Sequence, residues 1–250
     1  LSLTLVVAAG LFVQTFSRLA TLDVGFDREP LLAVSASLRP DEVAPAARLD
    51  LFVRMRDAVA AVPGVAAASA SFITPVSGSS WNTRIEIPDG PTLPENQRVP
   101  MINYILPGWF KTYGTTLLSG RDFDDRDRLG SPMVAVVNEA FARRFFPDGD
   151  AVGRVVREPP MRAGDVTEEY QIVGLVRDAV YRRLREPVPP TLYLPMRQFG
   201  EPGRSNASIT VRAASGAPLL LTRGVAEAIG TVAPGATLTF RGLSGLIDAS

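Results

Sequence analysis

Four aspartates crowd into a short stretch near the middle of the chain, and carboxylates at this density could hold a calcium ion. They are Asp122, Asp124, Asp125 and Asp127, followed by Gly130. A calcium loop of the EF-hand type needs a bidentate glutamate at its twelfth position. Counted from Asp122 or Asp125, that position holds Met133 or Val136. A solvated acidic turn is therefore the favoured interpretation, and calcium binding is the alternative.

The other catalytic patterns sought in the sequence are incomplete. Thr112 follows the only lysine, Lys111, but Phe110 stands where a phosphate-binding P-loop requires glycine. Ser77, Ser79 and Ser80 flank a glycine without forming a G-x-S-x-G turn, and the chain has no histidine to act as their base. The sequence therefore predicts no catalytic residues, no metal ligands, no cofactor-binding residues and no cofactor.

Composition narrows the possible classes of protein. The chain has 250 residues, and 46% of them are hydrophobic, so it can form a substantial core. Its 26 basic residues are balanced by 26 acidic ones, which argues against a nucleic-acid partner. Cysteine is absent, which excludes disulfides and thiolate metal sites.

Two further groups of side chains could recognise a ligand. Arg182, Arg183 and Arg185, with Tyr181, could meet an acidic partner or lipid head groups, but a solvated surface is the favoured interpretation. The large aromatic residues of the middle region could form a ligand cage. We expect them instead in the core or between subdomains; they are Trp81, Trp109 and Phe110.

The first 16 residues, Leu1–Phe16, carry no charge. As a helix they would cover about 24 Å, short of the roughly 30 Å of a bilayer core. The stretch is predicted to be the outer part of a transmembrane helix that begins before residue 1. The core of a signal peptide and a buried helix are the alternatives, although no basic region or small-residue cleavage site supports the former.

Similar β-α-β patterns stand at the two ends of the remaining chain. The first has an expected strand at Leu31–Leu38, an amphipathic helix at Pro45–Val62 and a strand at Val65–Phe72. The second has the corresponding elements at Ala207–Val211, Pro218–Val232 and Ala236–Phe240. We predict that the two halves pair in one split ferredoxin-like sandwich, with both chain ends on the same side. A chance likeness between two ordinary units is the alternative.

The stretch between the halves is expected to be rich in strands. Expected strands lie at Asn82–Ile87, Met101–Leu106, Tyr170–Val176 and Thr191–Leu194, and a short helix at Trp109–Tyr113. The run Val134–Arg154 predicts a buried strand and then a helix. Asn138 is the expected N-cap of that helix, because its side chain can accept a bond from a first-turn N–H. Arg143 and Arg144 are expected on the solvated face of the helix.

Five phrases in this order resemble the MacB-like periplasmic core domain of ABC transporter permeases. The resemblance extends to the MacB/FtsX-like family and is closest to its large orphan permeases with duplicated units. The phrases cover nearly the whole chain: LDVGFDREPLLAVSASL (Leu22–Leu38), PGWFKTYGTTLLSGRDF (Pro107–Phe123), VAVVNEAFARRFFPDGDAVGR (Val134–Arg154), IVGLVRDAVYRRLREPVPPTLYLP (Ile172–Pro195) and the closing β-α-β unit.

The resemblance implies an α+β fold with an inserted domain. Residues 25–75 and 205–245 would form a split ferredoxin-like, porter-like subdomain, and residues 76–204 a mixed α/β, sabre-like insert. Residues 1–24 would be the end of a transmembrane helix with its linker, and residues 246–250 would lead into further membrane helices. Residues after about 25 would be extracytoplasmic, on the periplasmic side of the cell inner membrane.

The implied function is non-catalytic: such a domain couples the motion of membrane helices to substrate export or handling outside the membrane. The implied partners are an ATP-binding ABC subunit in the cytoplasm, the lipid bilayer through the N-terminal helix, a second permease copy or half, and a periplasmic adaptor. A membrane-anchored ligand-binding sensor or enzyme domain is the alternative, and it would need convergent polar residues in a deep pocket. A scaffold in a permease that has lost its ATPase is a third possibility.

Overall fold

The computed structural model describes most of the chain after residue 30. The described residues are 7, 30–75, 77–88, 90–91, 93–147, 149–160, 166–179, 187–199 and 204–248. The predicted transmembrane segment at 1–24, apart from Val7, and the basic cluster at 181–185 lie outside these residues. Among the described helices, none has the length and apolarity needed to cross a bilayer.

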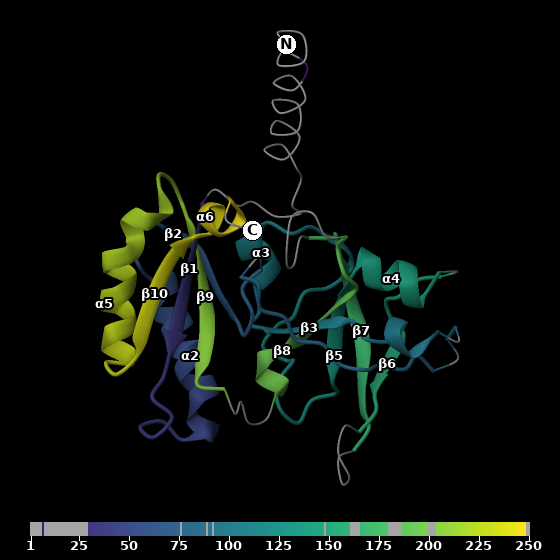
Figure 1. Cartoon of the computed structure of the whole chain (residues 1–250). Helices are drawn as coiled ribbons and strands as arrows, with labels where there is room; N and C mark the ends of the chain where they lie inside the picture. Colours follow the sequence, from purple (N-terminus) through teal and green to yellow (C-terminus); the bar gives the residue numbers. More distant parts are fainter. Residues whose placement is uncertain are drawn as a thin grey trace.

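The two β-α-β halves fold together, as predicted. The first consists of β1 (Leu31–Ser37), α2 (Pro45–Ala60) and β2 (Val65–Ser71), and the second of β9 (Asn206–Ala213), α5 (Thr222–Val232) and β10 (Thr237–Gly242). Their strands interleave in the antiparallel order β10-β1-β9-β2 (Figure 1). We call residues 31–75 and 205–242, which contain these six elements, the four-stranded unit.

Alternating side chains explain why both helices lie on one face of this sheet. Along β1, Leu32, Val34 and Ala36 share a core with Phe52 of α2 and Ile229 of α5. The intervening positions of β1, β9 and β10 are mostly polar and face away from the helices, as the period of two in a strand requires. The four-stranded unit therefore has one helix-covered face and one largely polar face.

The chain enters and leaves the four-stranded unit at the same end of its sheet. Leu32, near the start of β1, pairs with Gly242, the last residue of β10. A short helix, α6 (Leu243–Asp248), follows, and its buried Leu243 packs into the core. The helix expected from Pro218 instead begins as a 3-10 turn, η3 (Pro218–Leu221), before α5.

Residues 76–204, which we call the insert, add six strands. They are β3 (Met101–Ile105), β4 (Leu117–Gly120), β5 (Val134–Asn138), β6 (Val155–Glu158), β7 (Glu168–Val176) and β8 (Thr191–Pro195). They continue the sheet in the order β3-β8-β5-β7-β4, with β6 also on β7. The helical segments of the insert are α3 (Trp109–Tyr113), α4 (Glu139–Phe145), η1 (Glu95–Gln97) and η2 (Met196–Gln198).

Three parts of the insert differ from the sequence prediction. The strand expected at Asn82–Ile87 is reduced to single bridges at Asn82 and Glu86. One cause is Pro100 in the facing segment, because proline has no N–H to continue a ladder. Two short strands, β4 and β6, were not predicted, since neither four-residue segment has a clear alternating pattern.

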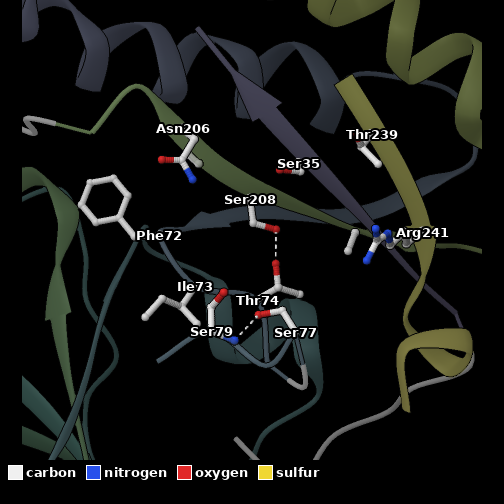
Figure 2. Close-up of a pocket in the computed structure, with 12 residues that line it drawn as sticks. Ser35, Phe72, Ile73, Thr74, Ser77, Ser79, Asn206, Ser208, Thr239 and Arg241 are labelled. Atoms are coloured by element: carbon white, nitrogen blue, oxygen red, sulfur yellow. Dashed lines mark hydrogen bonds between the residues drawn. The ribbon is translucent and has the colours of Figure 1, made fainter. Parts of the chain in front are cut away.

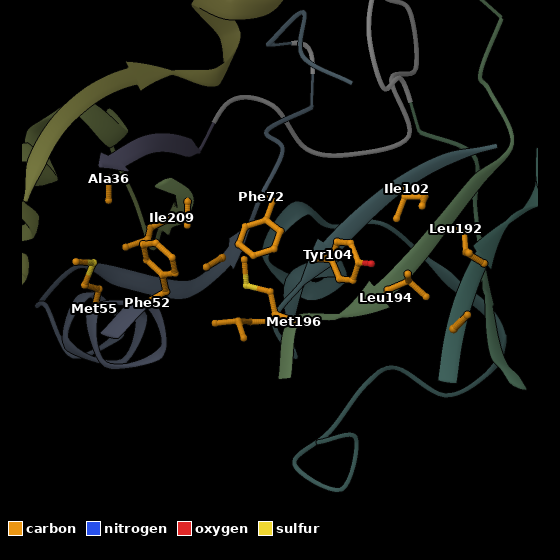
Figure 3. Close-up of a cluster of buried hydrophobic side chains, with 14 of the residues drawn as sticks. Ala36, Phe52, Met55, Phe72, Ile102, Tyr104, Leu192, Leu194, Met196 and Ile209 are labelled. Atoms are coloured by element: carbon orange, nitrogen blue, oxygen red, sulfur yellow. The ribbon is translucent and has the colours of Figure 1, made fainter. Parts of the chain in front are cut away.

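Two buried cores run across the boundary between the four-stranded unit and the insert. In the first, Phe72 lies between Phe52 of α2 and the insert residues Tyr104 and Met196 (Figure 3). The second joins Leu31 and other residues of β1 and α6 to α3, β5 and Tyr193 of β8. The insert is therefore packed onto the four-stranded unit through shared cores.

Candidate functional site

The candidate site is a hollow of about 280 Å³ on the polar face of the four-stranded unit. Strands β1, β9 and β10 form its floor, and the segment after β2 forms its opposite wall (Figure 2). Hydroxyl groups dominate its lining: Ser35, Thr74, Ser77, Ser79, Ser208 and Thr239. Two of them tie the wall to the floor through a 2.5 Å hydrogen bond between Thr74 Oγ1 and Ser208 Oγ.

The polar groups of the hollow could bind a ligand. Among the described residues that line it, Arg241 is the one that carries a charge, and Asn206 adds an amide. The described lining has no Asp, Glu, His or Cys beside the serines. The arrangement can donate hydrogen bonds to a neutral or anionic group, and the serines that the sequence drew attention to act here as polar lining.

A buried amide fastens the insert to the four-stranded unit beside this hollow. Asn103 of β3 accepts a hydrogen bond from the Ile73 N–H at 3.1 Å and donates one to the Ile73 carbonyl at 2.9 Å. Its side chain thereby satisfies both backbone groups of the residue just past β2, where β2 and β3 share only the pair Ser71 and Ile105. Asn103 is fully buried, so losing these bonds would leave polar groups unpaired.

A cluster of aromatic side chains lies at the boundary between the four-stranded unit and the insert. Phe199 packs 4.4 Å from Tyr104 and 6.0 Å from Phe72, measured between ring centroids. Trp81 completes the cluster, and the Arg204 guanidinium lies 4.7 Å from its ring centroid. Burial raises the pKa of Tyr104 above its ordinary value, so this phenol stays neutral.

Helix α3 forms the third attachment, on the polar face of the sheet. The Tyr113 hydroxyl lies 2.8 Å from Thr210 Oγ1 of β9, and Arg212 Nε donates to the Thr112 carbonyl at 2.7 Å. Trp109 stacks on Tyr113 at 4.2 Å and Phe110 packs edge-on against Tyr193 at 5.0 Å. Trp109 and Phe110 are therefore core residues at the boundary, as expected, and Trp81 belongs to the aromatic cluster.

Two carboxylates of the acidic loop are paired with arginines of the same loop. Asp127 is buried and makes a two-pronged ion pair with Arg121, at 2.7 and 2.8 Å. Asp124 is paired with Arg126 at 2.7 Å, which holds the pKa of this carboxyl well below its usual range. The acidic loop is thus a turn held by ion pairs. The prediction of a solvated turn is wrong for Asp127, because its carboxylate is buried against Arg121. No group of three or more acidic residues within the described part of the chain could hold a metal ion.

The remaining predicted positions lie apart from the hollow. Lys111 is on the exposed side of α3, and Ser80 is exposed just beyond the wall. Arg143 is exposed but pairs with Asp178 at 2.5 Å. Sequence reasoning missed Asn103 and Tyr113. A polar residue inside the apolar strand MINYI was the available signal for Asn103, because buried amides need dedicated partners.

The sequence model of the MacB-like periplasmic core domain matches residues 1–239. The chain belongs to this family. Membership implies an extracytoplasmic location, in keeping with a family of ABC transporter permease domains. No curated protein sequence matches the chain.

Solved structures share the fold at low sequence identity. The periplasmic region of MacB from Actinobacillus actinomycetemcomitans aligns with a TM-score of 0.60 and 13% identity, over 92% of this chain and 95% of that one. A domain of a permease protein from Porphyromonas gingivalis gives 0.52 and 15%, over 86% and 90%. The extracellular domain of the ABC-type transporter YknZ from Gram-positive bacteria gives 0.50 and 15%, over 83% and 99%.

Proposed function

We propose that this domain is the non-catalytic extracytoplasmic part of an ABC-type permease, where it couples the motion of membrane helices to substrate export or handling outside the membrane. The observation that carries the proposal is the pairing of Leu32 with Gly242. The segments before β1 and after β10 meet the body on adjacent strands, so a movement of either segment acts on the same end of the sheet.

Stiffness of the body supports the same role. Asn103, the aromatic cluster and α3 attach the insert to the four-stranded unit at separate places, and both cores cross the boundary. A displacement applied at one end would therefore reach the insert with little loss, because packed interiors deform little. The hollow beside Arg241 would be the surface offered to a substrate. The domain boundaries would lie after β2, near residue 75, and before β9, near residue 205.

Co-purification from membranes tests the proposal. The full-length protein, tagged and extracted in mild detergent, should bring down an ATP-hydrolysing subunit, and the complex should hydrolyse ATP. A variant lacking residues 30–245 should keep the subunit, because the proposed contact is cytoplasmic. If the intact protein brings down no ATPase and hydrolyses no ATP under conditions that preserve membrane complexes, the coupling role fails.

A further inference from the structure

Two leucines have exposed side chains at the end of the sheet where the chain enters and leaves the four-stranded unit. Leu220 is 81% exposed and Leu219 is 56% exposed, both on η3. The turn is held in place, since Leu221 packs on the core and Thr222 Oγ1 donates to the Leu219 carbonyl at 2.7 Å. Their exposure therefore follows from the fold.

Three connections at this end carry no charged residue. The connections that form it are residues 61–64, 213–222 and 242–245, none of which contains Asp, Glu, Lys or Arg. They lie together: the Ala214 N–H bonds to the Gly64 carbonyl at 2.8 Å, and the Ala213 N–H to the Pro30 carbonyl at 2.8 Å (top of Figure 1, beside α6). We call these three connections the apolar end.

The opposite end of the same sheet has a different character. The connection after β1 exposes Arg39, Asp41 and Glu42. Beside the apolar end, the nearest exposed charged residues along α5 and β10 are arginines, Arg223 and Arg241, and Arg223 is paired with Glu227 at 2.9 Å. The nearest charged residue before residues 61–64 is Asp57, which is paired with Arg56 at 2.6 Å. Exposed leucines with arginines beside them match the chemistry of a bilayer surface, with phosphates outside and acyl chains beneath.

We propose that the apolar end rests on the bilayer, with Leu219 and Leu220 inserted among the lipids and Arg223 and Arg241 at phosphate level. The proposal rests on the proposed function, since it needs the uncharged stretch 1–16 to lie in the same membrane. That stretch alone does not enforce contact, because residues 17–29 could span up to about 45 Å when extended. The contact would hold this end of the body at the membrane surface, and the body could still tilt about it.

Fluorescence quenching by brominated lipids tests the contact. The chain has no cysteine, so single cysteines can be introduced without removing native ones. The full-length protein would be labelled at Leu220→Cys with a polarity-sensitive dye and reconstituted in phosphatidylcholine and phosphatidylglycerol vesicles, with and without brominated acyl chains. We expect brominated lipid to lower the emission about twofold, because an interfacial side chain reaches the boundary of the acyl chains.

Three control positions keep the outcomes distinct. Leu129→Cys replaces a leucine of similar exposure, 68%, on the acidic loop of the insert, and Thr237→Cys lies at the opposite end of β10. Neither should be quenched. Ala9→Cys, within the uncharged stretch, should be quenched if that stretch is in the membrane.

Each other result has a definite meaning. Quenching at position 9 with position 220 matching position 129 would overturn the contact and leave the membrane anchor intact. No quenching at position 9 would overturn the anchor, and with it the proposed function. A blue-shifted but unquenched label at position 220 would show a protein surface covering the leucines, which would also overturn the lipid contact.

Discussion

The acidic loop shows how charge pairing decides what a cluster of carboxylates can do. Asp127 gives both oxygens to Arg121, and Asp127 Oδ2 also accepts the Asp124 N–H at 2.9 Å. A calcium ion would have to replace these bonds and face the nearby guanidinium groups. We predict that millimolar calcium leaves the melting temperature of the protein unchanged.

Removal of the buried carboxylate should be costly. Asp127→Ala leaves the Arg121 guanidinium and the Asp124 N–H without this acceptor, so we expect a loss of about 2 kcal/mol in the free energy of unfolding. Asp125→Ala is the matched control, since the Asp125 side chain is 88% exposed, and it should change stability by less than about 0.5 kcal/mol. Urea denaturation measures both. Equal stability of the two variants would contradict the structural role of the pair.

The stability of the protein should depend on pH at a place where two glutamates face each other across neighbouring strands. Glu158 of β6 is directly opposite Glu168 of β7. The Tyr170 hydroxyl donates to Glu168 and lies 3.4 Å from Glu158 Oε2. Glu158 also accepts from Thr83 at 2.5 Å. Burial, and then the neighbouring Glu168, raise the pKa of Glu158 above its ordinary value.

A raised folded-state pKa favours folding while the carboxyl is protonated, and this contribution is lost as the pH rises through the folded-state pKa. We therefore predict that Glu158→Gln, which keeps an acceptor for Thr83, stabilises the protein at about pH 8 by up to about 1 kcal/mol. Near pH 4 the gain should vanish. Thermal unfolding across this range is the measurement, and a gain that is constant with pH would refute the assignment.

At the scale of elements, one side chain joins the end of β5, the start of α4 and the start of β8. Asn138 Oδ1 accepts from the Phe141 N–H at 3.0 Å, as the sequence predicted for an N-cap, and also from the Thr191 N–H at 2.8 Å. Its amide donates to the Pro189 carbonyl at 3.0 Å. The capping residue thus also holds a neighbouring strand.

Asn138→Ala should lower the free energy of unfolding by about 3 kcal/mol, since it removes the cap and two further buried bonds. Asn138→Asp keeps the acceptors and should cost less. The control is Asn96→Ala, at an exposed position of η1. A cost near 1 kcal/mol for Asn138→Ala would mean that the cap alone matters.

The elements that the sequence predicted well are those with a local signal. The apolar spacing of α2 and the Asn138 cap both lie within a few residues of the helix that they determine. The contacts between the insert and the four-stranded unit could not be predicted from such local signals. Asn103 bonds a residue 30 positions away, and Tyr113 one 97 positions away, and no periodic pattern encodes such contacts. The hollow itself arises from this packing, so its lining was predicted only as isolated serines.

At the scale of the molecule, the attachment of the insert should be separable from the stability of each part. Asn103→Ala removes both hydrogen bonds to Ile73. We expect the free energy of unfolding to fall by about 2 kcal/mol. Hydrogen exchange should become faster at the segment after β2 and at β3. Exchange within β5 and β7 should change less. Uniformly faster exchange throughout the chain would contradict a local fastening role.

The proposed coupling requires the body to move as one piece when an attached ATPase changes state. The most direct test is energy transfer from a dye at Leu129→Cys to acceptor lipids, in the full-length protein reconstituted with its ATPase, before and after ATP addition. We predict an ATP-dependent change in transfer to the bilayer, while the distance between dyes at Leu129→Cys and Thr237→Cys stays constant. If energy transfer to the lipids does not change with ATP, or if only the distance between the two dyes changes, the domain does not move as a rigid body with the ATPase.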